Sequence, residues 1–170
     1  DNKQKNQFLN DNHIQGEDKS SIKTGLYYNG ELVACMTFGK LRKITGSKHI
    51  NNHYELIRYT TKLNTSIVGG FSKLLNYFKI TYKPEKIVSY ADRRWSTGNL
   101  YEKLGFKFIH KTTPNYYYII DNNRFHRFNF RKDVLVKEGF DPTKTEHEIM
   151  IERGINRIFN SGNLKYIFNI

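Results

Sequence analysis

The sequence predicts a mixed α/β (α+β) fold, in which a mostly antiparallel sheet is flanked by helices. Short β-rich runs alternate with helical periodicity, in the order helix, three strands, helix, strand, helix, two strands. One hairpin is clearly marked, because Asn29-Gly30 separates two such runs and accepts the positive φ angles of a type I′ turn. The 170 residues are enough for a buried core, to which 12 Phe and 12 Tyr contribute large side chains.

Start and stop signals place the individual elements. Gly16 ends a first helix, Ser66 caps a second, and Pro84 breaks that helix before the next strand. Gly105 closes a third, short helix. The first expected elements are a helix at 3–15, a hairpin at 25–38, a polar loop at 40–53 and a strand at 54–60. A helix at 68–82, a strand at 86–91, a short helix at 98–104 and paired strands at 106–110 and 115–120 follow.

The last 50 residues are expected to add a strand, a helix and a hairpin. Alternating basic and aromatic residues at 124–132 predict the strand, a capping box at 145–148 starts the helix, and residues 157–168 form the hairpin. One helix and one hairpin bury little surface on their own. The sequence therefore predicts a core at residues 1–120, with a basic C-terminal extension at 121–170 packed on the same domain.

Charge indicates the class of partner. The chain has 28 Lys and Arg against 16 Asp and Glu, which gives a net charge of +12. A domain this basic attracts polyanions, of which nucleic acid is the commonest, although a lysine-rich composition that only aids solubility explains the same excess.

Other features narrow the location and the chemistry. Cys35 is the only cysteine, which excludes an internal disulfide and indicates a reducing compartment such as the cytoplasm. No apolar run reaches the roughly 20 residues that span a bilayer, so no membrane partner is expected. The six histidines show no metal-ligand spacing, and no metal site is predicted.

A pair of glycines follows the strand at 54–60 and opens the next helix. Backbone N–H groups at a helix N-terminus attract anions, and glycines allow a close approach. A pyrophosphate is one ligand that suits such a loop, and close packing of helix against strand is the other explanation. The expected cofactor-binding residues are Val68, Gly69, Gly70 and Ser72.

Residues 100–106, with the sequence LYEKLGF, resemble the signature helix and turn of the GNAT N-acyltransferases. The glycine pair lies one strand–helix unit upstream, where that family binds the pyrophosphate of coenzyme A. The resemblance covers residues 27–118 and implies a GNAT-like sheet and a CoA thioester such as acetyl-CoA as cofactor. Two departures stand out. The glycine loop lacks the family's Gln or Arg, and Arg94 stands where many members have Asn.

Two narrower resemblances point to DNA. The segment Ser89-Tyr90-Ala91-Asp92, followed by Gly98 and Tyr101, is similar to one in the phage Mom-like DNA-modification proteins, as is the upstream strand at 55–58. The whole chain, including residues 90–106 and 145–166, is still more similar to the C-terminal domain of phage homing-endonuclease-like proteins. In those a nuclease module comes first, and because this chain starts at Asp1 rather than Met, such an upstream module is expected. A phage origin would place the protein in the host cytoplasm.

Three residues are candidates for catalysis. The resemblance implies that the Tyr101 phenol protonates the departing thiolate, whereas an ordinary packed tyrosine is the alternative. Asp92, at the end of a strand, is placed to act as a base or to orient an amine, and a cap on the next turn is the alternative. Glu55 either deprotonates the amine through water or pairs with Arg58 or another basic residue.

Basic residues beside aromatic rings are the candidates for nucleic-acid contacts. Two guanidiniums beside the Trp95 indole suit phosphate binding plus base stacking, although Trp95 as a core anchor is the alternative. The basic strip at 124–132 is either a phosphate-contacting surface or an amphipathic edge strand. The expected nucleic-acid-binding residues are Arg58, Arg93, Arg94, Trp95, Arg124, Arg127, Arg131 and Lys132.

The leading hypothesis is therefore transfer of an acyl or related group from a CoA-type donor to a base in DNA. A non-catalytic DNA-binding or targeting domain of a homing-endonuclease-like protein is the second hypothesis. A GNAT enzyme that acts on a protein or a small molecule is the third.

Overall fold

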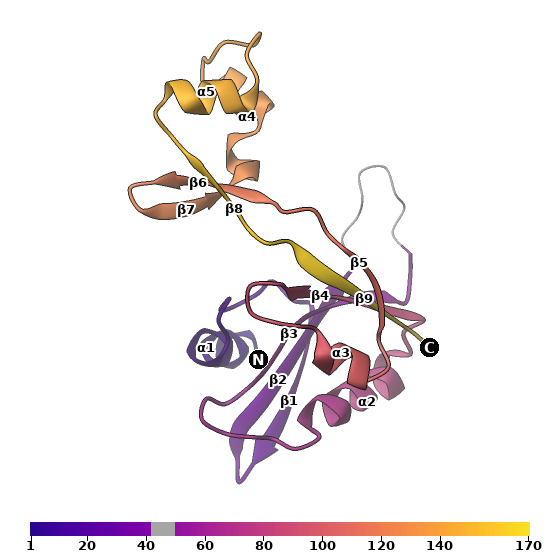
Figure 1. The fold of residues 1–170 in the computed structure, drawn as a ribbon. Helices are drawn as coiled ribbons and strands as arrows, with labels where there is room; N and C mark the ends of the chain where they lie inside the picture. The colour runs from indigo at the N-terminus through magenta and orange to yellow at the C-terminus, as the bar shows by residue number, and fades with distance from the viewer. Residues whose placement is uncertain (42–49) are drawn as a thin grey trace. The chain divides into compact units, whose positions relative to one another are not determined.

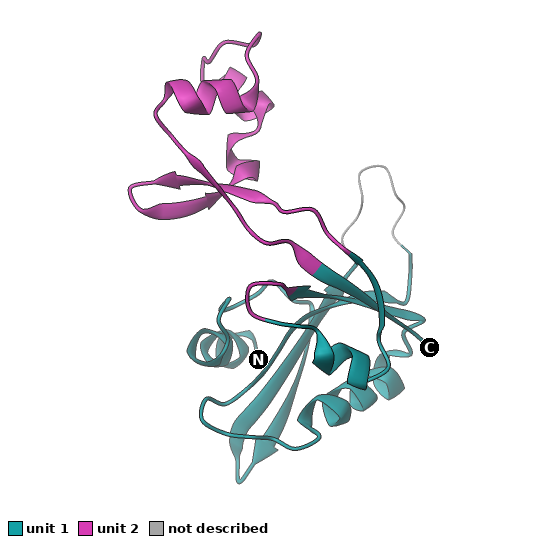
Figure 2. Ribbon diagram, in the orientation of Figure 1, with its two compact units in different colours: residues 1–91, 96–110, 164–170 teal, residues 92–95, 111–163 magenta. Residues whose placement is uncertain are grey.

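The computed structural model describes residues 1–41 and 50–170 (Figure 1). The chain folds as two compact units (Figure 2). Unit 1 comprises residues Asp1–Ala91, Ser96–His110 and Leu164–Ile170, and unit 2 comprises Asp92–Trp95 and Lys111–Asn163. Unit 2 is thus inserted into unit 1 along the chain, because the chain leaves unit 1 and later returns to it.

Unit 1 is built on a six-stranded sheet with the strand order β1-β2-β3-β4-β9-β5. The strands are β1 (Ile22–Tyr28), β2 (Glu31–Lys40), β3 (His53–Thr61), β4 (Lys86–Asp92), β5 (Lys107–Lys111) and β9 (Asn163–Asn169). The helices are α1 (Asn2–Asn12), α2 (Gly70–Tyr82) and α3 (Asn99–Lys103). Helix α1 lies on one face of the sheet, and α2 and α3 lie on the other (Figure 1). The predicted mixed, mostly antiparallel sheet flanked by helices is confirmed.

The predicted hairpin joins β1 to β2. Asn29 and Gly30 have φ angles of 48° and 79°, as a turn with two positive φ angles requires. In β2 the side chains alternate between the two faces. Phe38 stacks on Phe78 of α2 with ring centroids 3.6 Å apart, whereas Thr37 bonds Asp18 on the side of α1.

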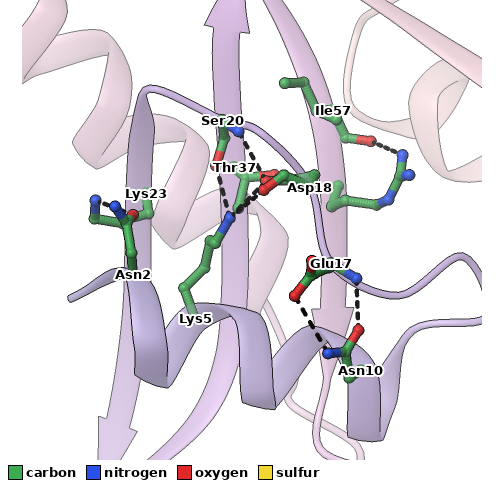
Figure 3. A network of polar contacts seen from close by, with 10 residues as sticks. Asn2, Lys5, Asn10, Glu17, Asp18, Ser20, Lys23, Thr37 and Ile57 are labelled. Carbon is green, nitrogen blue, oxygen red and sulfur yellow. Dashed lines mark hydrogen bonds and ion pairs between the residues drawn. The ribbon is translucent and has the colours of Figure 1, made fainter.

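A buried ion pair fixes α1 to the sheet (Figure 3). The Lys5 ammonium donates to the Asp18 carboxylate at 2.8 Å, and both side chains are only 4% exposed. The Thr37 hydroxyl and the Ser20 backbone N–H also donate to Asp18. Burial alone would raise the pKa of Asp18, but these hydrogen bonds outweigh it and lower the pKa. Burial, with the Asp18 charge, raises the pKa of the neighbouring Cys35 to about 11, so this thiol is protonated at neutral pH.

The C-terminal strand differs from the sequence prediction. Strand β9 enters the large sheet between β4 and β5, instead of forming a hairpin with residues 157–159. The reason is packing, because Tyr166 of β9 is 1% exposed within the core of unit 1, where Phe168 contacts Phe106. The expected division at residue 120 therefore also differs from the structure, since the large sheet is completed only by the last residues of the chain.

Unit 2 contains a three-stranded sheet with the order β7-β6-β8. Its elements are β6 (Tyr116–Ile120), β7 (Asn123–His126), the 3₁₀ turn η1 (Arg127–Phe130), α4 (Lys132–Lys137), α5 (Glu146–Glu152) and β8 (Arg157–Phe159). Strand β6 pairs with β7 and β8, so the expected pairing of residues 106–110 with 115–120 is wrong. A separate small core holds unit 2 together, made of Tyr118, Leu135, Ile149 and Met150.

Within unit 2 one local prediction is confirmed and one is wrong. The capping box of Thr145 and Glu148 starts α5. The basic strip at 124–132 is a strand only as far as His126. There the imidazole accepts the Phe128 N–H and starts η1, and Phe130 then packs on the small core.

Two further predictions concern loops and membranes. Most of the expected loop at 40–53 lies outside the described residues, since 42–49 are not described. No helix in the described part of the chain is long and apolar enough to cross a membrane.

Candidate functional site

The two parallel strands of unit 1 separate part of the way along their length. β3 and β4 pair from His53 opposite Lys86 to Leu56 opposite Ser89. Both strands then continue, β3 to Thr61 and β4 to its end three residues later. We call the end of this pairing, at Leu56 and Ser89, the fork. It lies toward the carboxyl ends of parallel strands, where open α/β sheets bind their ligands.

The phenol of Tyr101 reaches the fork. Its oxygen lies 2.9 Å from Ser89 Oγ, which in turn lies 3.0 Å from the carbonyl oxygen of Leu56. A serine hydroxyl has one proton and a carbonyl can only accept. For both contacts to be hydrogen bonds, Tyr101 must donate to Ser89 and Ser89 to Leu56. Burial raises the pKa of Tyr101, so the phenol is protonated at neutral pH.

Aromatic packing fixes the position of this phenol. The Tyr101 ring stacks on Tyr166, with centroids 5.1 Å apart, and meets Phe71 and Phe106 edge-on. Gly98, which precedes α3, has φ +84°, and a Cβ there would overlap the Tyr166 hydroxyl. The packed-tyrosine alternative is thus correct for the ring, while the hydroxyl points to the fork. Its role as an acid stays a prediction.

The glycine pair lies at the N-terminus of α2, on the same side of the sheet. Gly69 is the N-cap with φ +69°, so the predicted cap at Ser66 is wrong. Among the described residues, no side chain caps α2, and its first turn has no acidic residue. Val68 is 90% exposed beside it. This helix end is therefore open to solvent and presents N–H groups and the positive end of the dipole.

The second glycine has a packing role. A Cβ at Gly70 would come within 2.9 Å of Ile67 and 3.0 Å of the Tyr59 hydroxyl. That hydroxyl also accepts the N–H of Phe71. Gly70 thus supports the close-packing explanation, whereas Gly69 has open space around it and fits the anion explanation.

A surface depression of about 430 Å³ runs along α2. This volume is within the usual range of ligand pockets. Lys73 and Lys79 give it positive charge, and Lys79 lies 4.9 Å from the centre of the Phe168 ring. Its lining residues are Ser72, Lys73, Leu75, Asn76, Lys79, Leu104 and Phe168.

The other two catalytic candidates lie in less favourable surroundings. The Asp92 carboxylate accepts two bonds from the Arg94 guanidinium, at 2.6 and 3.0 Å, and one from the Arg94 N–H. The Arg94 hydrogen bonds lower the pKa of Asp92, which favours its capping role and weakens it as a base. Glu55 is buried in β3 with 4% exposure, so the proposed contact through water stays a prediction.

The structure distributes the expected nucleic-acid residues over both units. Arg58 belongs to β3 of unit 1, and the other seven belong to unit 2. Arg93 donates to the Ser161 and Gly162 carbonyl oxygens, which fixes the turn after β4. Trp95 is 65% exposed, so the core-anchor alternative is wrong.

Arginines of the basic strip lie over aromatic rings. Arg124 lies over Tyr117, Arg127 over Tyr116 and Arg131 over Phe128, at 4.6, 5.1 and 3.8 Å from the ring centres. Lys132 is exposed at the start of α4.

Ser89 and Tyr166 hold Tyr101 in place, but neither had a role assigned from the sequence, and Ser89 appeared only within the motif at 89–92. A hydroxyl inside the apolar strand KIVSYAD was the available signal for Ser89. Tyr166 lies 65 residues after Tyr101 and gave no local signal. Across residues 1–41 and 50–170, no group of three or more His, Cys, Asp or Glu residues is arranged to hold a metal ion.

Comparison with known proteins gives structural similarity only. No protein-family model and no curated protein sequence matches the chain. The PaiA N-acetyltransferase of Thermoplasma acidophilum, solved with coenzyme A, is 23% identical with a TM-score of 0.43, over 54% of each chain. An N-acetyltransferase from Staphylococcus aureus is 12% identical with a TM-score of 0.47, over 86% of this chain and 66% of the other. The chain therefore spans less than two thirds of the length of both.

A third structure is more similar overall. The ribosomal-protein-S18-alanine N-acetyltransferase of Escherichia coli is 11% identical with a TM-score of 0.54, over 100% of this chain and 88% of the other. This identity is too low to carry function across, but the score shows a common architecture. The chain has the fold of the GNAT-type N-acetyltransferases.

Proposed function

We propose that unit 1 binds a CoA thioester, such as acetyl-CoA, and transfers its acyl group to an amine. The observation that carries this proposal is the Tyr101 phenol, held protonated at the fork of two parallel strands, with an open glycine-led helix N-terminus following the first of them. A fold alone does not define a function, so the proposal rests on these residues.

The donor would lie along α2. The pyrophosphate would accept hydrogen bonds from backbone N–H groups of the segment 68–72 other than those of Gly70 and Phe71, which already have partners. Gly69 allows close approach, and Lys73 would add charge. The depression along α2 would hold a further part of the donor against Asn76 and Lys79. The acyl carbonyl would then lie at the fork.

Tyr101 would supply the proton that the leaving group needs. The amine nitrogen attacks the thioester carbon, a C–N bond forms, and the C–S bond breaks. The phenol gives its proton to the departing sulfur, the amine loses one proton to water, and the phenol is reprotonated from solvent. A phenol with a raised pKa starts this step in the required protonated state.

The acceptor that we propose is an exocyclic amine of a DNA base, as the resemblance to the phage Mom-like proteins implies. The charge of +12, the exposed Trp95 and the arginines over rings in unit 2 support it. One observation favours a non-catalytic DNA-binding domain instead, as in homing-endonuclease-like proteins. The carboxylate of Asp92 is held by Arg94, which removes one candidate base.

Calorimetry with acetyl-CoA tests the donor half. We expect saturable binding with a Kd below about 1 mM, as is usual for enzyme substrates. No binding at millimolar acetyl-CoA would exclude acyl transfer. Radiolabelled acetyl-CoA incubated with heat-denatured DNA tests the acceptor half. Label that reaches water or an added peptide, but not DNA, would point to another acceptor.

A further inference from the structure

Arginine is concentrated in unit 2. Unit 2 contains seven of the nine arginines in the chain but only four of the chain's 19 lysines. Lysine is a mobile point charge, whereas the planar guanidinium stacks on rings and still offers its edges to phosphates. The uneven distribution therefore indicates that unit 2 has a use for planar cations that general solubility does not require.

Two of these arginines form a continuous series with two aromatic rings. Arg127 lies 5.1 Å from the centre of the Tyr116 ring, and Arg157 lies 5.2 Å from both Tyr116 and Phe159. Tyr116 and Phe159 are direct partners across β6 and β8, with ring centres 5.6 Å apart. We call these four residues the guanidinium–ring stack.

The stack is firmly positioned. The Tyr116 hydroxyl donates to the Glu146 carboxylate at 2.9 Å, which ties the ring to α5. The sheet pairing of Tyr116 with Phe159 fixes the two strands. A prepositioned ring and guanidinium lose less side-chain entropy when a ligand binds than mobile groups would.

The stack ends in a ring that the protein does not cover. Phe159 is 54% exposed, although it sits in a unit with its own buried core. Phe128, next to Arg127 in sequence, is 59% exposed and lies under Arg131. Packing within the chain does not account for two half-exposed phenylalanines that are each paired with a guanidinium.

We infer that the guanidinium–ring stack of unit 2 binds a single-stranded polynucleotide. An unpaired base stacks on Phe159, and the adjoining phosphates accept hydrogen bonds from Arg127 and Arg157. The ring and the guanidiniums together suit a ligand that has a flat, uncharged face next to an anion. Each nucleotide with an unpaired base has both groups. In a duplex both faces of a base are already stacked, so the exposed ring selects unpaired strands.

This inference deepens the acceptor half of the proposed function and is independent of the donor half. Unit 1 contributes 15 lysines, which attract any polyanion, while the stack distinguishes an unpaired strand from a duplex. The amine of an unpaired base is also free for attack, whereas in a duplex it is hydrogen-bonded.

Fluorescence anisotropy on the full chain, without any CoA compound, tests the inference. The probes are a labelled 12-nucleotide oligothymidylate, the matching oligouridylate and a 12-base-pair DNA duplex. We expect the wild-type chain to bind at least one single strand about tenfold or more tightly than the duplex. Phe159→Ala should weaken single-strand binding by about 5- to 150-fold, which is the effect of losing one base stack.

Matched variants separate stacking from charge. Arg157→Lys keeps the charge but loses the planar group, so it should weaken single-strand binding, while Arg153→Lys, at the Phe140 ring outside the stack, should not. Tyr28→Ala removes an exposed ring of unit 1 and should also leave binding unchanged. Thermal melts confirm that each variant is folded.

Three results would overturn the inference: no binding of either single strand, equal or tighter binding of the duplex, or a folded Phe159→Ala variant within twofold of wild type. Acetyl-CoA binding measured on the same Phe159→Ala protein keeps the two proposals apart. If Phe159→Ala binds acetyl-CoA as the wild type does but no longer binds single strands, both proposals are supported. If the wild-type chain does not bind acetyl-CoA, only the donor proposal is refuted.

Discussion

A carboxylate at the start of α2 should strengthen the helix and weaken donor binding. Ser72 is the third residue after the N-cap Gly69, it is exposed, and it lines the depression along α2. The first turn has no acidic residue among those described, so Ser72→Asp places a negative charge at the positive end of the dipole. We expect it to stabilise the helix by about 0.3–1 kcal/mol.

The same charge would face the pyrophosphate of the donor. Two unit charges about 4 Å apart repel by about 1 kcal/mol in bulk water and about 4 kcal/mol at the effective dielectric constant of a protein surface. The Kd for acetyl-CoA should therefore rise at least about fivefold and as much as several hundredfold. Because salt screens exposed charges, the difference should shrink between 0.1 M and 1 M salt.

Calorimetry at both salt concentrations and a thermal melt measure the two effects. Ser72→Asn is the control, since its side chain has the same shape as Asp without the charge. The expected result is a melting temperature equal to or above that of the control together with weaker acetyl-CoA binding. If Ser72→Asp binds acetyl-CoA within twofold of Ser72→Asn, the pyrophosphate does not lie at this helix end.

Three further predictions follow from contacts in unit 1. Tyr101→Phe should lower kcat for acyl transfer by about 10²- to 10⁴-fold, with the Kd for acetyl-CoA unchanged, as thiol-release assays and calorimetry would measure. Gly98→Ala should destabilise the fold by about 2–5 kcal/mol in urea unfolding, because it combines left-handed strain with overlap at Tyr166. Lys5→Met should cost about 3–5 kcal/mol at pH 7, because it leaves Asp18 buried and unpaired. Since the pKa of Asp18 is lowered on folding, its stabilising contribution in the wild type is present above its ordinary pKa of 3.8 and is lost as the pH falls through the folded value.

Each of these predictions has an internal control. Tyr166→Phe alters the same ring stack and should keep kcat within a few-fold, so an equal loss in both variants would mean that Tyr101 acts through packing. Gly30→Ala has a similar φ of +79° but nothing within 4 Å of its Cβ, and an equal cost at both glycines would disprove the overlap at Gly98. Adding Asp18→Asn to Lys5→Met should recover most of the lost stability and should make the free energy of unfolding less dependent on pH in acid. A double variant no more stable than Lys5→Met would contradict the charge argument.

Local features of both units could be predicted from the sequence. The turn at Asn29-Gly30 and the start of α5 depend on residues a few positions apart, and both are confirmed. The place of β9 could not be predicted in this way. Its two neighbours in the sheet, β4 and β5, end at Asp92 and Lys111, far from the start of β9 at Asn163. A closing hairpin with residues 157–159 satisfies the same local pattern.

For the candidate site, too, the sequence identified residues but not the contacts that they make. The motif around Tyr101 identified the residue, but only the structure shows that its hydroxyl contacts Ser89, which in turn donates to the Leu56 carbonyl oxygen. For Asp92 the sequence allowed a base or a cap, and the neighbouring guanidinium of Arg94 favours the cap. The basic strip alternates like a strand through residue 132, but the hydrogen bond at His126 ends the extended conformation. Such competition between a side chain and the backbone hydrogen bonds of a strand cannot be predicted from the alternation of residue types.

The longer segment of unit 2, residues 111–163, leaves and rejoins the large sheet at a single pair of residues. Thr112 donates its N–H to the Asn163 carbonyl oxygen at 2.8 Å, and the Thr112 hydroxyl accepts the N–H of Asn163 at 2.9 Å. Residues 113–162 are thus the loop of a β-hairpin whose stem, β5 and β9, belongs to the large sheet, while the short segment Asp92–Trp95 of unit 2 lies outside this loop. A gene segment could be gained, lost or exchanged at this tip in a single event, with both stem strands intact. Such an arrangement lets an inserted segment diversify while its scaffold is inherited unchanged, and it marks residues 113–162 as the segment to transplant between scaffolds.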